Sequence, residues 1–427
     1  MRVLVLGGGG REHALAWRLA RDPGVDVVTA PGNPGSARVG AVRPVDLASP
    51  GDMLALAERE RVDLTVVGPE APLDLGVADL FRSAGRTIVG PTRTGAALEC
   101  SKAFAKAFMQ RHRVPTARFA VCTTLAEALD TVAGPRFGFP VVVKADGLAA
   151  GKGVVIAADR AEAERAVRAA MEDRQFGDAG ARLVIEECLS GPEVSFFVLA
   201  DGERAIEFGT AQDHKRLGDG DHGPNTGGMG AFAPSSLISP ALAAKVMSGI
   251  VEPVLSGLRA EGAPYCGFLY VSLMLTADGP KVIEFNVRFG DPEAQAVLPL
   301  VEGSLADLLM AAATGGLAGR RATFSAARAV GVVLASRGYP ATSESGRPIA
   351  GLDRAAALPG ALVFHAGTKA SGPDIVSAGG RVLTVVGLGP SYEDAMARAY
   401  AAVDAIQFDG MQFRRDIGQK ALAPITQ

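Results

Sequence analysis

The run EFNVRFGDPE, which begins at Glu284, holds the residues best suited to chemistry. Residues two apart in a strand share a face, so Glu284, Asn286 and Arg288 are expected on one side. The alternating apolar residues are expected in a core: Ile283, Phe285 and Val287. A carboxylate beside an amide oxygen suits Mg²⁺ or Mn²⁺ bridging nucleotide phosphates, and an arginine can hold an anion through two parallel hydrogen bonds. The run therefore predicts metal ligands and an adjacent anion site, with a plain half-exposed strand as the alternative.

A glycine-rich segment between two apolar runs is the second candidate. The sequence FPVVVKADGLAAGKGVVI, which begins at Phe139, places Lys144 at a strand end and a hairpin from Gly147 to Gly153. Glycines let backbone amides close on phosphate oxygens, while Lys144 and Lys152 supply positive charge. It is not a P-loop, because Gly-Lys is followed by glycine and the loop opens into a strand. We expect a mobile lid that ATP orders; an exposed hairpin with solvated lysines is the alternative.

Three further segments give weaker signals. The strand-like run from Val184 to Leu189 offers an exposed backbone that can pair with an adenine edge, and Glu193 can accept from ribose hydroxyls, although such acids are more often solvated. His214, in QDHKR, is a candidate general base, although a lone histidine in a charged stretch is more often a hydrogen-bonding neighbour. The glycine-rich stretch from Gly218 to Gly230 has no periodicity and predicts a long functional loop.

The glycine run from Gly7 to Gly10 lies between a strand and a helix, where a dinucleotide-binding turn places a pyrophosphate. The spacing of that motif fails, because Glu12 stands at the third glycine position and the second strand ends without an acidic residue. The run therefore argues against a NAD site. It favours backbone N–H groups that hold the phosphate of a smaller ligand, with simple strand–helix packing as the alternative.

A chain of 427 residues is too long for one ordinary hydrophobic core, so we expect about three domains. These domains must position the residues named above. Up to about Gly95, β-rich runs alternate with helical stretches, which predicts a parallel α/β sheet. Its strands are expected at Val3 to Leu6, Val25 to Ala30, Leu64 to Gly68 and Thr87 to Gly90. A mixed α+β part follows, with a helix at Ser101 to Arg111 and strands at Pro140 to Lys144, Gly153 to Ala157 and Arg182 to Glu187. A smaller domain after Gly315 is expected to hold strands at Ala329 to Ala335, Leu362 to Ala366 and Arg381 to Val386, then a helix at Tyr392 to Ile406.

The composition favours a globular protein with small-molecule partners. Hydrophobic residues make up 48% and charged residues 21%, and the net charge is -3, which argues against a nucleic-acid surface or a polybasic membrane anchor. The cysteines are far apart and form no zinc or redox pair: Cys100, Cys122, Cys188 and Cys266. We find no signal-like start and no apolar run of about 18 residues, so we expect a cytoplasmic protein without a membrane span.

Taken together, these strings resemble the phosphoribosylamine glycine ligase family, also called glycinamide ribonucleotide synthetase, of the ATP-grasp superfamily. The resemblance runs the length of the chain. It is carried by GGGGREHALAW from Gly7, PGN from Pro31, VGPEAPL from Val67, SKAF from Ser101, KADGLAAGKGV from Lys144, QDHKR from Gln212, GPNTGGMGA from Gly223, EFNVRFGDPE from Glu284 and FHAGT from Phe364.

The resemblance implies a multidomain α/β and α+β fold. Its parts would be an N-terminal parallel α/β domain (1–100), an ATP-grasp domain (101–315) with a mobile lid at about 115–190, and a small C-terminal α+β domain (320–427). ATP would be held by Lys102, Lys144, Gly147, Gly151, Lys152, Gly153, Glu186, Glu187 and Glu193. The substrate pocket would contain Gly9, Gly10, Asn33, Glu70, Asp213, Arg288 and Asp291, and the catalytic residues would be Arg288, Asp213 and Lys144. Magnesium would be held by Glu284 and Asn286.

The reaction that the resemblance implies is the ATP-dependent joining of glycine to 5-phosphoribosylamine, through glycyl phosphate, in purine biosynthesis. The enzyme would act as a monomer on small molecules. Another ATP-grasp carboxylate–amine ligase and a non-catalytic ATP-sensing module are the alternatives. The chain departs from the family at Ala341-Thr342-Ser343 and at Gln419, both in the C-terminal part. The strand Phe268 to Leu275 also lacks the second acid that often completes an ATP-grasp metal site, so a further ligand must come from elsewhere or from water.

Overall fold

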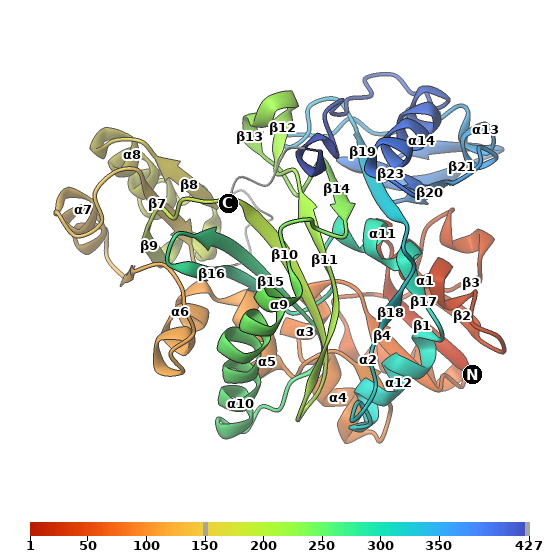
Figure 1. The fold of residues 1–427 in the computed structure, drawn as a ribbon, viewed down its shortest axis with the longest axis horizontal. Coiled ribbons are helices and arrows are strands. Elements are labelled where there is room, and N and C mark those ends of the chain that lie inside the picture. Colours follow the sequence, from red (N-terminus) through yellow and green to blue (C-terminus); the bar gives the residue numbers. More distant parts are fainter. Residues whose placement is uncertain (148–152, 423–427) are drawn as a thin grey trace.

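The N-terminal part is a parallel sheet in the order β3-β2-β1-β4-β5, in a computed structural model that describes residues 1–147 and 153–422 (Figure 1). Its strands are β1 (Arg2–Gly7), β2 (Asp26–Pro31), β3 (Ala41–Val42), β4 (Leu64–Val67) and β5 (Ile88–Val89). Its helices are α1 (Gly10–Leu19), α2 (Pro50–Arg59), α3 (Glu70–Asp74), α4 (Val77–Ser83) and α5 (Arg93–Cys100). Alternate residues of β1 enter two different cores, Leu4 with α2 and Val5 with α1, because both faces of a parallel sheet are covered. The predicted sheet is confirmed, and β3 is the strand that the sequence did not indicate.

A second unit, residues 119–187, is a four-stranded antiparallel sheet in the order β6-β9-β7-β8. It comprises β6 (Phe119–Cys122), α7 (Leu125–Ala133), β7 (Val141–Ala145), β8 (Val154–Ala157), α8 (Arg160–Met171) and β9 (Leu183–Glu187), and α6 (Lys102–Arg111) leads into it. The unit has its own hydrophobic cluster, in which Val143 and Ile185 pack with Val167 of α8. Figure 1 shows it projecting from the body on the side opposite the C-terminal elements. We call it the β6–β9 unit.

An eight-stranded sheet in the order β16-β15-β10-β11-β14-β19-β23-β20 forms the rest of the framework. Its strands are β10 (Glu193–Asp201), β11 (Ala205–Asp213), β14 (Gly230–Ala233), β15 (Cys266–Thr276), β16 (Gly279–Asn286), β19 (Arg328–Ala335), β20 (Ala361–His365) and β23 (Arg381–Gly389). The short strand β14 pairs with β11 on one side and with β19 on the other. The central and C-terminal parts, expected as separate domains, therefore share one sheet.

Shorter elements surround this sheet. The helices are α9 (Pro240–Val246), α10 (Glu252–Ala260), α11 (Glu293–Val297), α12 (Leu305–Thr314), α13 (Leu352–Ala356) and α14 (Tyr392–Asp404). Three two-stranded ribbons are β12 (Arg216–Gly218) with β13 (His222–Asn225), β17 (Val301–Glu302) with β18 (Thr323–Phe324), and β21 (Thr368–Ser371) with β22 (Asp374–Ser377). The predicted long loop from Gly218 to Gly230 is thus partly wrong, because its first half is the β12–β13 hairpin.

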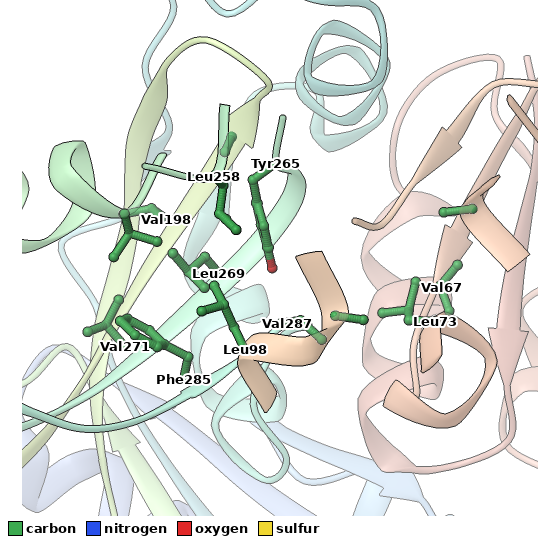
Figure 2. Packing of buried hydrophobic residues seen from close by; sticks show 14 of the residues in the cluster. Val67, Leu73, Leu98, Val198, Leu258, Tyr265, Leu269, Val271, Phe285 and Val287 are labelled. Atoms are coloured by element: carbon green, nitrogen blue, oxygen red, sulfur yellow. The ribbon is translucent and has the colours of Figure 1, made fainter. Parts of the chain in front are cut away.

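A bulge in β16 changes which of its residues enter the core. Ser272 of β15 pairs with Glu284, but the next residue, Leu273, pairs with Val282, so Ile283 is an extra residue. Val282, Phe285 and Val287 are consequently the buried residues, packed in the core that Figure 2 shows. The prediction that Ile283 points into the core was wrong.

Residues Pro240–Ala260 form one continuous helical stretch that is long and apolar enough, by length and composition, to cross a membrane. Its apolar side chains Val246, Ile250 and Val254 lie in the same hydrophobic cluster as Val198 and Leu269 of the central sheet. A buried core helix passes the same test of length and hydropathy, so this single stretch is weak support for a membrane span.

Candidate active site

Glu284 lies among four cationic side chains from separate parts of the chain. Burial acts to raise the pKa of Glu284, but Lys215, Lys144, Lys102 and Arg288 together hold that pKa below its usual value. These cations come from the segment between β11 and β12, from β7, from the start of α6 and from the segment after β16. The arrangement can neutralise an anion of high charge while keeping one carboxylate ionised.

Asn286 follows Glu284 by two residues on β16. Its amide nitrogen donates to the Phe285 carbonyl at 2.8 Å. Within residues 1–147 and 153–422, no group donates to the Asn286 amide oxygen, and no cluster of three or more His, Cys, Asp or Glu suited to a metal is found. A carboxylate and an amide oxygen are hard ligands, so the pair fits a divalent cation whose other ligands are phosphate oxygens or water.

Lys144 belongs to a buried triad. Its Nζ lies 2.9 Å from Oε1 of Glu186, and Nζ of Lys106 lies 2.8 Å from Oε2 of the same carboxylate. Lys106 also donates to Thr116 at 2.7 Å, and burial lowers the pKa of Lys106 to about 8, although Glu186 opposes the shift. Lys106 was not among the site residues predicted from the sequence. Its spacing of four from Lys102 on α6 was the available signal, since such residues share a helix face.

Lys102 is the first residue of α6, and its Nζ donates to the Gly147 carbonyl at 3.2 Å. Asp146 connects the start of α6 with the segment before β9, because its carboxylate accepts from the Ala103 N–H at 2.6 Å and from Nε of Arg182 at 2.8 Å. Gly153, just before β8, is bonded to the end of β7, since its carbonyl accepts from the Ala145 N–H at 2.8 Å. Gly151 and Lys152, predicted to bind ATP, lie outside the described residues.

The carboxylates expected around the nucleotide have specific partners. Glu187 accepts from the Arg118 N–H at 2.9 Å and pairs with the Arg118 guanidinium at 2.5 Å, while Glu193, the first residue of β10, accepts from Nζ of Lys215 at 2.9 Å. Strand β9 pairs with β6 on one side and β7 on the other. The expectation of an exposed β9 backbone is therefore wrong up to Glu187, and only the residues after the strand are outside the ladder.

Asp213 is the last residue of β11 and is half-buried. Burial raises the pKa of Asp213 to about 7, and Lys215 acts in the opposite direction. Burial also acts on Lys215, but Asp213 and Glu193 hold the pKa of that lysine well above its usual value. Among residues 1–147 and 153–422, no side chain donates to the Asp213 carboxylate, and with its pKa raised to about 7 this group suits proton transfer near neutral pH.

His214 lies on the other side of this strand end. It is buried, its ring centroid is 6.0 Å from that of Phe232, and both ring nitrogens lack a hydrogen-bond partner among the described residues. Burial lowers the pKa of His214 to about 4. Adjacent strand residues point to opposite faces, so His214 does not share a face with Asp213 and Lys215. The geometry gives no support to a general base at His214.

Arg288 is held by two carboxylates. Its Nε donates to Glu70 at 3.2 Å and its Nη2 donates to Glu99 at 2.8 Å. Glu99 also accepts from the Val287 N–H at 2.7 Å. Burial raises the pKa of Glu99 to about 7, although Arg288 opposes the shift. Glu99 was not a predicted site residue, because a single acid near a helix end gives no signal in the sequence.

Asp291 is held by Gln295 and Arg381. Gln295 donates to it at 2.9 Å, and Nη1 of Arg381 donates to the Asp291 carbonyl at 2.8 Å and to the Gly227 carbonyl at 2.6 Å. Gly228 has a φ of +111°, and a Cβ there would lie 2.5 Å from Cδ of Pro292, so only glycine fits this approach. The glycine-rich loop and the Gly-Asp-Pro turn are thereby packed against each other.

The space beside the first glycine run is occupied by the side chain of Glu12, which belongs to the helix that follows the run. Glu12 accepts from the Gly9 N–H at 2.6 Å and pairs with Arg11 at 2.6 Å. Gly7 has a φ of +123°, and a Cβ there would lie 2.5 Å from Cγ of Glu12, so glycine makes room for the carboxylate. A phosphate can therefore use the Gly9 N–H only by displacing Glu12. The Gly10 Cα lies close to Gln295, because a Cβ there would be 2.6 Å from Nε2 of that residue.

Asn33 supports the glycine run through its side chain. Its amide nitrogen donates to the carbonyls of Gly8 at 2.9 Å and His365 at 2.8 Å, and its amide oxygen accepts from the N–H groups of Gly35 and Ser36. The amide is fully used by these bonds. Its side chain thus connects the glycine run to the C-terminal part instead of presenting a free group to a substrate.

The two departures noted in the sequence do not reach these residues. Ala341 to Ser343 and Gln419 are exposed. The preceding Gly-Tyr-Pro stretch does contact the site region, since the Tyr339 hydroxyl accepts from the Gly227 N–H at 2.9 Å.

Three features together define an ATP-grasp ligase. They are a parallel α/β domain, a small antiparallel sheet that carries a buried Lys–Glu pair, and a central antiparallel sheet whose edge strand β16 carries Glu284 and Asn286. Three domain descriptions cover most of the chain: the N domain of phosphoribosylglycinamide synthetase matches residues 1–99, its ATP-grasp (A) domain residues 100–294 and its C domain residues 329–420. The chain belongs to this family, the phosphoribosylamine–glycine ligases.

Individual relatives agree with this assignment. The phosphoribosylamine–glycine ligase of Xanthomonas axonopodis pv. citri is 53% identical over 99% of this chain and 98% of its own length. The crystal structure of the Thermotoga maritima phosphoribosylamine–glycine ligase is 34% identical, has a TM-score of 0.85, and covers 97% of this chain and 100% of its own. The biotin carboxylase domain of a Hydrogenobacter thermophilus 2-oxoglutarate carboxylase, solved with MgADP and bicarbonate, shares the fold at 20% identity, a TM-score of 0.70, and coverage of 96% of this chain and 91% of its own.

Proposed function

We propose that the chain uses ATP to join glycine to 5-phosphoribosylamine, giving glycinamide ribonucleotide, ADP and phosphate in de novo purine biosynthesis. The similarity to phosphoribosylamine–glycine ligases over nearly the whole chain supports the choice of substrates. The observation that supports the chemistry is the position of Glu284, a half-buried carboxylate among Lys215, Lys144, Lys102 and Arg288. Such a cluster suits the terminal phosphates of ATP together with a divalent cation.

The cations beside Glu284 have separate tasks in this proposal. Lys144 and Lys102 neutralise the ATP phosphates, and Glu186 keeps Lys144 in place through the ion pair at 2.9 Å. The β6–β9 unit acts as the lid over ATP; the predicted lid segment from Gly147 to Gly153 lies mostly outside the described residues, which omit 148–152. Glu284 and Asn286 hold Mg²⁺ or Mn²⁺, which supplies charge neutralisation on the phosphates when bound.

The reaction proceeds in two displacements. A carboxylate oxygen of glycine attacks the γ-phosphorus of ATP, the bond to the β–γ bridging oxygen breaks, and ADP leaves. The amine of phosphoribosylamine then attacks the carbonyl carbon of glycyl phosphate, and phosphate departs with the oxygen that came from glycine. Asp213 accepts the proton that the amine loses, for which its pKa of about 7 is suited. Arg288 holds the glycine carboxylate and then the acyl phosphate, and Gly9, Gly10, Glu70 and Asp291 line the same pocket.

Two other functions make different predictions. Another ATP-grasp carboxylate–amine ligase would release ADP with a different acid or amine, and an ATP-sensing module would bind ATP without turnover. The Glu284–Asn286 pair argues against the sensor, because a sensor has little use for metal ligands beside an anion site. We further propose that the enzyme works as a cytoplasmic monomer.

An assay of ADP release decides among these functions. The purified chain, Mg²⁺ and ATP are combined with glycine alone, with phosphoribosylamine alone, and with both together. Two further mixtures replace one substrate each: alanine for glycine, or phosphoribose for phosphoribosylamine. ADP release that requires glycine and phosphoribosylamine together supports the proposal. Release with neither, or with only a different acid or amine, contradicts it.

A further inference from the structure

The guanidinium of Arg288 is oriented by groups from two different helices. Glu70, the first residue of α3, accepts from its Nε at 3.2 Å, and Glu99, near the end of α5, accepts from its Nη2 at 2.8 Å. Nη1 donates to the Phe289 carbonyl at 3.2 Å. A guanidinium has five N–H donors, so among the described residues these contacts leave two for another ligand.

Glu99 also holds the backbone from which Arg288 projects. The ladder between β15 and β16 ends with Tyr270 opposite Asn286, so the next N–H group, that of Val287, has no strand partner. The Glu99 carboxylate accepts from this N–H at 2.7 Å. One carboxylate thus fixes both the backbone before Arg288 and the guanidinium itself, which is a two-point constraint on the direction of the side chain.

The Glu99 carboxylate has little capacity left for a substrate. One oxygen accepts from Arg288 and the other from Val287, and the side chain is only 7% exposed. Its helix is anchored beside the strand, because Leu98 of α5 lies in the same hydrophobic cluster as Phe285 and Val287 (Figure 2). Both the contacts and the burial point to an action through Arg288 and not on the reactants.

We infer that Glu99 is a positioning residue, which fixes Arg288 on the substrate side of the Glu284–Asn286 pair. The inference rests on the proposed function, in which Arg288 holds the glycine carboxylate and glycyl phosphate. Glu70 is different from Glu99 in this respect, since its side chain is 31% exposed and contacts Arg288 through the longer bond of 3.2 Å. Glu99 is therefore the residue that sets the geometry.

The test uses the full-length enzyme, the double variant Glu99→Gln/Arg288→Lys and four single variants: Glu99→Gln, Glu99→Asp, Arg288→Lys and Glu261→Gln. Glutamine still accepts from Val287 but presents no charge to Arg288, and aspartate keeps the charge with a shorter reach. Glu261 is the matched control, because it pairs with Arg111 at 3.0 Å on the surface. For each variant we would measure the melting temperature, kcat, and KM for ATP and for glycine.

We expect Glu99→Gln to lower kcat/KM for glycine about 100-fold, the scale on which a displacement of about 1 Å acts, with KM for ATP nearly unchanged. Glu99→Asp should recover part of the loss, and Glu261→Gln should match the wild type. The double variant Glu99→Gln/Arg288→Lys should be no slower than Arg288→Lys alone, because removing a positioning residue has no further effect once its target has changed.

Four results would overturn the inference. The first three are wild-type kinetics in Glu99→Gln, equal changes in KM for ATP and glycine, and losses that multiply in the double variant. The fourth is a lower melting temperature of Glu99→Gln with a lower kcat but an unchanged KM for glycine, because a smaller fraction of folded enzyme then explains the loss and the residue is merely structural. A wild-type enzyme without glycine-dependent ADP release would refute the proposed function instead, so the two failures are distinguishable.

Discussion

Oε1 of Glu186 on β9 lies 2.9 Å from Nζ of Lys144 on the neighbouring strand β7. The opposite oxygen is held by Lys106, so the carboxylate connects a lysine of the β6–β9 unit with a lysine of α6. Both lysines and the glutamate are buried. This relationship makes Glu186 the residue that keeps Lys144 in a fixed position.

Glu186→Gln should raise KM for ATP roughly tenfold, as expected when the buried ion pair that positions Lys144 is weakened by about 1.4 kcal/mol. KM for glycine should change much less, because Arg288 does not contact this triad. Steady-state kinetics with each substrate varied would measure both constants. Glu164→Gln is the control, since Glu164 pairs with Arg160 on the exposed side of the same unit. A larger change in KM for glycine than in KM for ATP would contradict this assignment.

Glu284→Ala should leave the fold intact and remove activity at physiological Mg²⁺, because the remaining amide of Asn286 holds a divalent cation too weakly. Circular dichroism would report the fold and ADP release the activity. Glu203→Ala, at an exposed turn, is the control. Near wild-type turnover in a folded Glu284→Ala variant would show that the metal is held elsewhere.

The proton acceptor should be visible in a pH profile. Because burial raises the pKa of Asp213 to about 7, its basic form is lost as the pH falls below 7. We expect kcat to decrease about tenfold per pH unit below that value, the limiting slope for one ionisation. Asp213→Asn should be slow and should lack this dependence. A variant that keeps the wild-type profile would assign the ionisation to another group.

Buried histidines should make stability depend on pH. Burial lowers the pKa of His13 to about 3 and the pKa values of His214 and His365 to about 4, from a usual value of 6.5. Between these values and 6.5 the histidines bind more protons in the unfolded chain, so their contribution to stability is fully present above pH 6.5 and is lost as the pH falls. Each histidine contributes up to about 1.4 kcal/mol per pH unit in this window.

Calorimetric melting of the wild type and of His214→Leu at pH 7.5 and pH 5 isolates the contribution of one histidine, because Asp213 and Glu99, whose pKa values burial raises to about 7, act in the opposite direction in both proteins. His214→Leu should reduce the difference in melting temperature between the two pH values, because both ring nitrogens of His214 lack partners among the described residues and an apolar side chain suits the contact with Phe232. His222→Gln, at an exposed position, should leave the difference unchanged. A pH difference in melting temperature that is as large in His214→Leu as in the wild type would contradict the contribution of His214.

Local patterns predicted most of the fold. The strands around Leu4, Val66 and Val143 are apolar runs bounded by turn residues, and such runs determine strands locally. The bulge at Ile283 was not predictable, because it depends on the pairing of β16 with β15, which lies outside the window of a pattern. The shared sheet was missed for the same reason, since β14 has four residues and its two partners are far apart in sequence.

The candidate site was predictable where residue type and spacing occur together, as in Glu284 and Asn286. Lys106 and Glu99 could not be predicted in the same way, because the role of each depends on a contact with a residue distant in the sequence. Lys106 pairs with Glu186, and Glu99 pairs with Arg288. Asn33 shows the reverse case. Its residue type suits ligand binding, yet four hydrogen bonds within the protein occupy its amide.

The central claim, a ligation through glycyl phosphate, is tested most directly with glycine that carries heavy oxygen in its carboxylate. The carboxylate oxygen that attacks the γ-phosphorus leaves with phosphate when the amine displaces it, so mass spectrometry should find one labelled oxygen in the released phosphate for each product formed. ADP should be the nucleotide product, because in our proposal Lys144, Lys102 and Glu284 act on the terminal phosphates of ATP. Unlabelled phosphate formed together with product, or label in AMP with release of pyrophosphate, would contradict the mechanism.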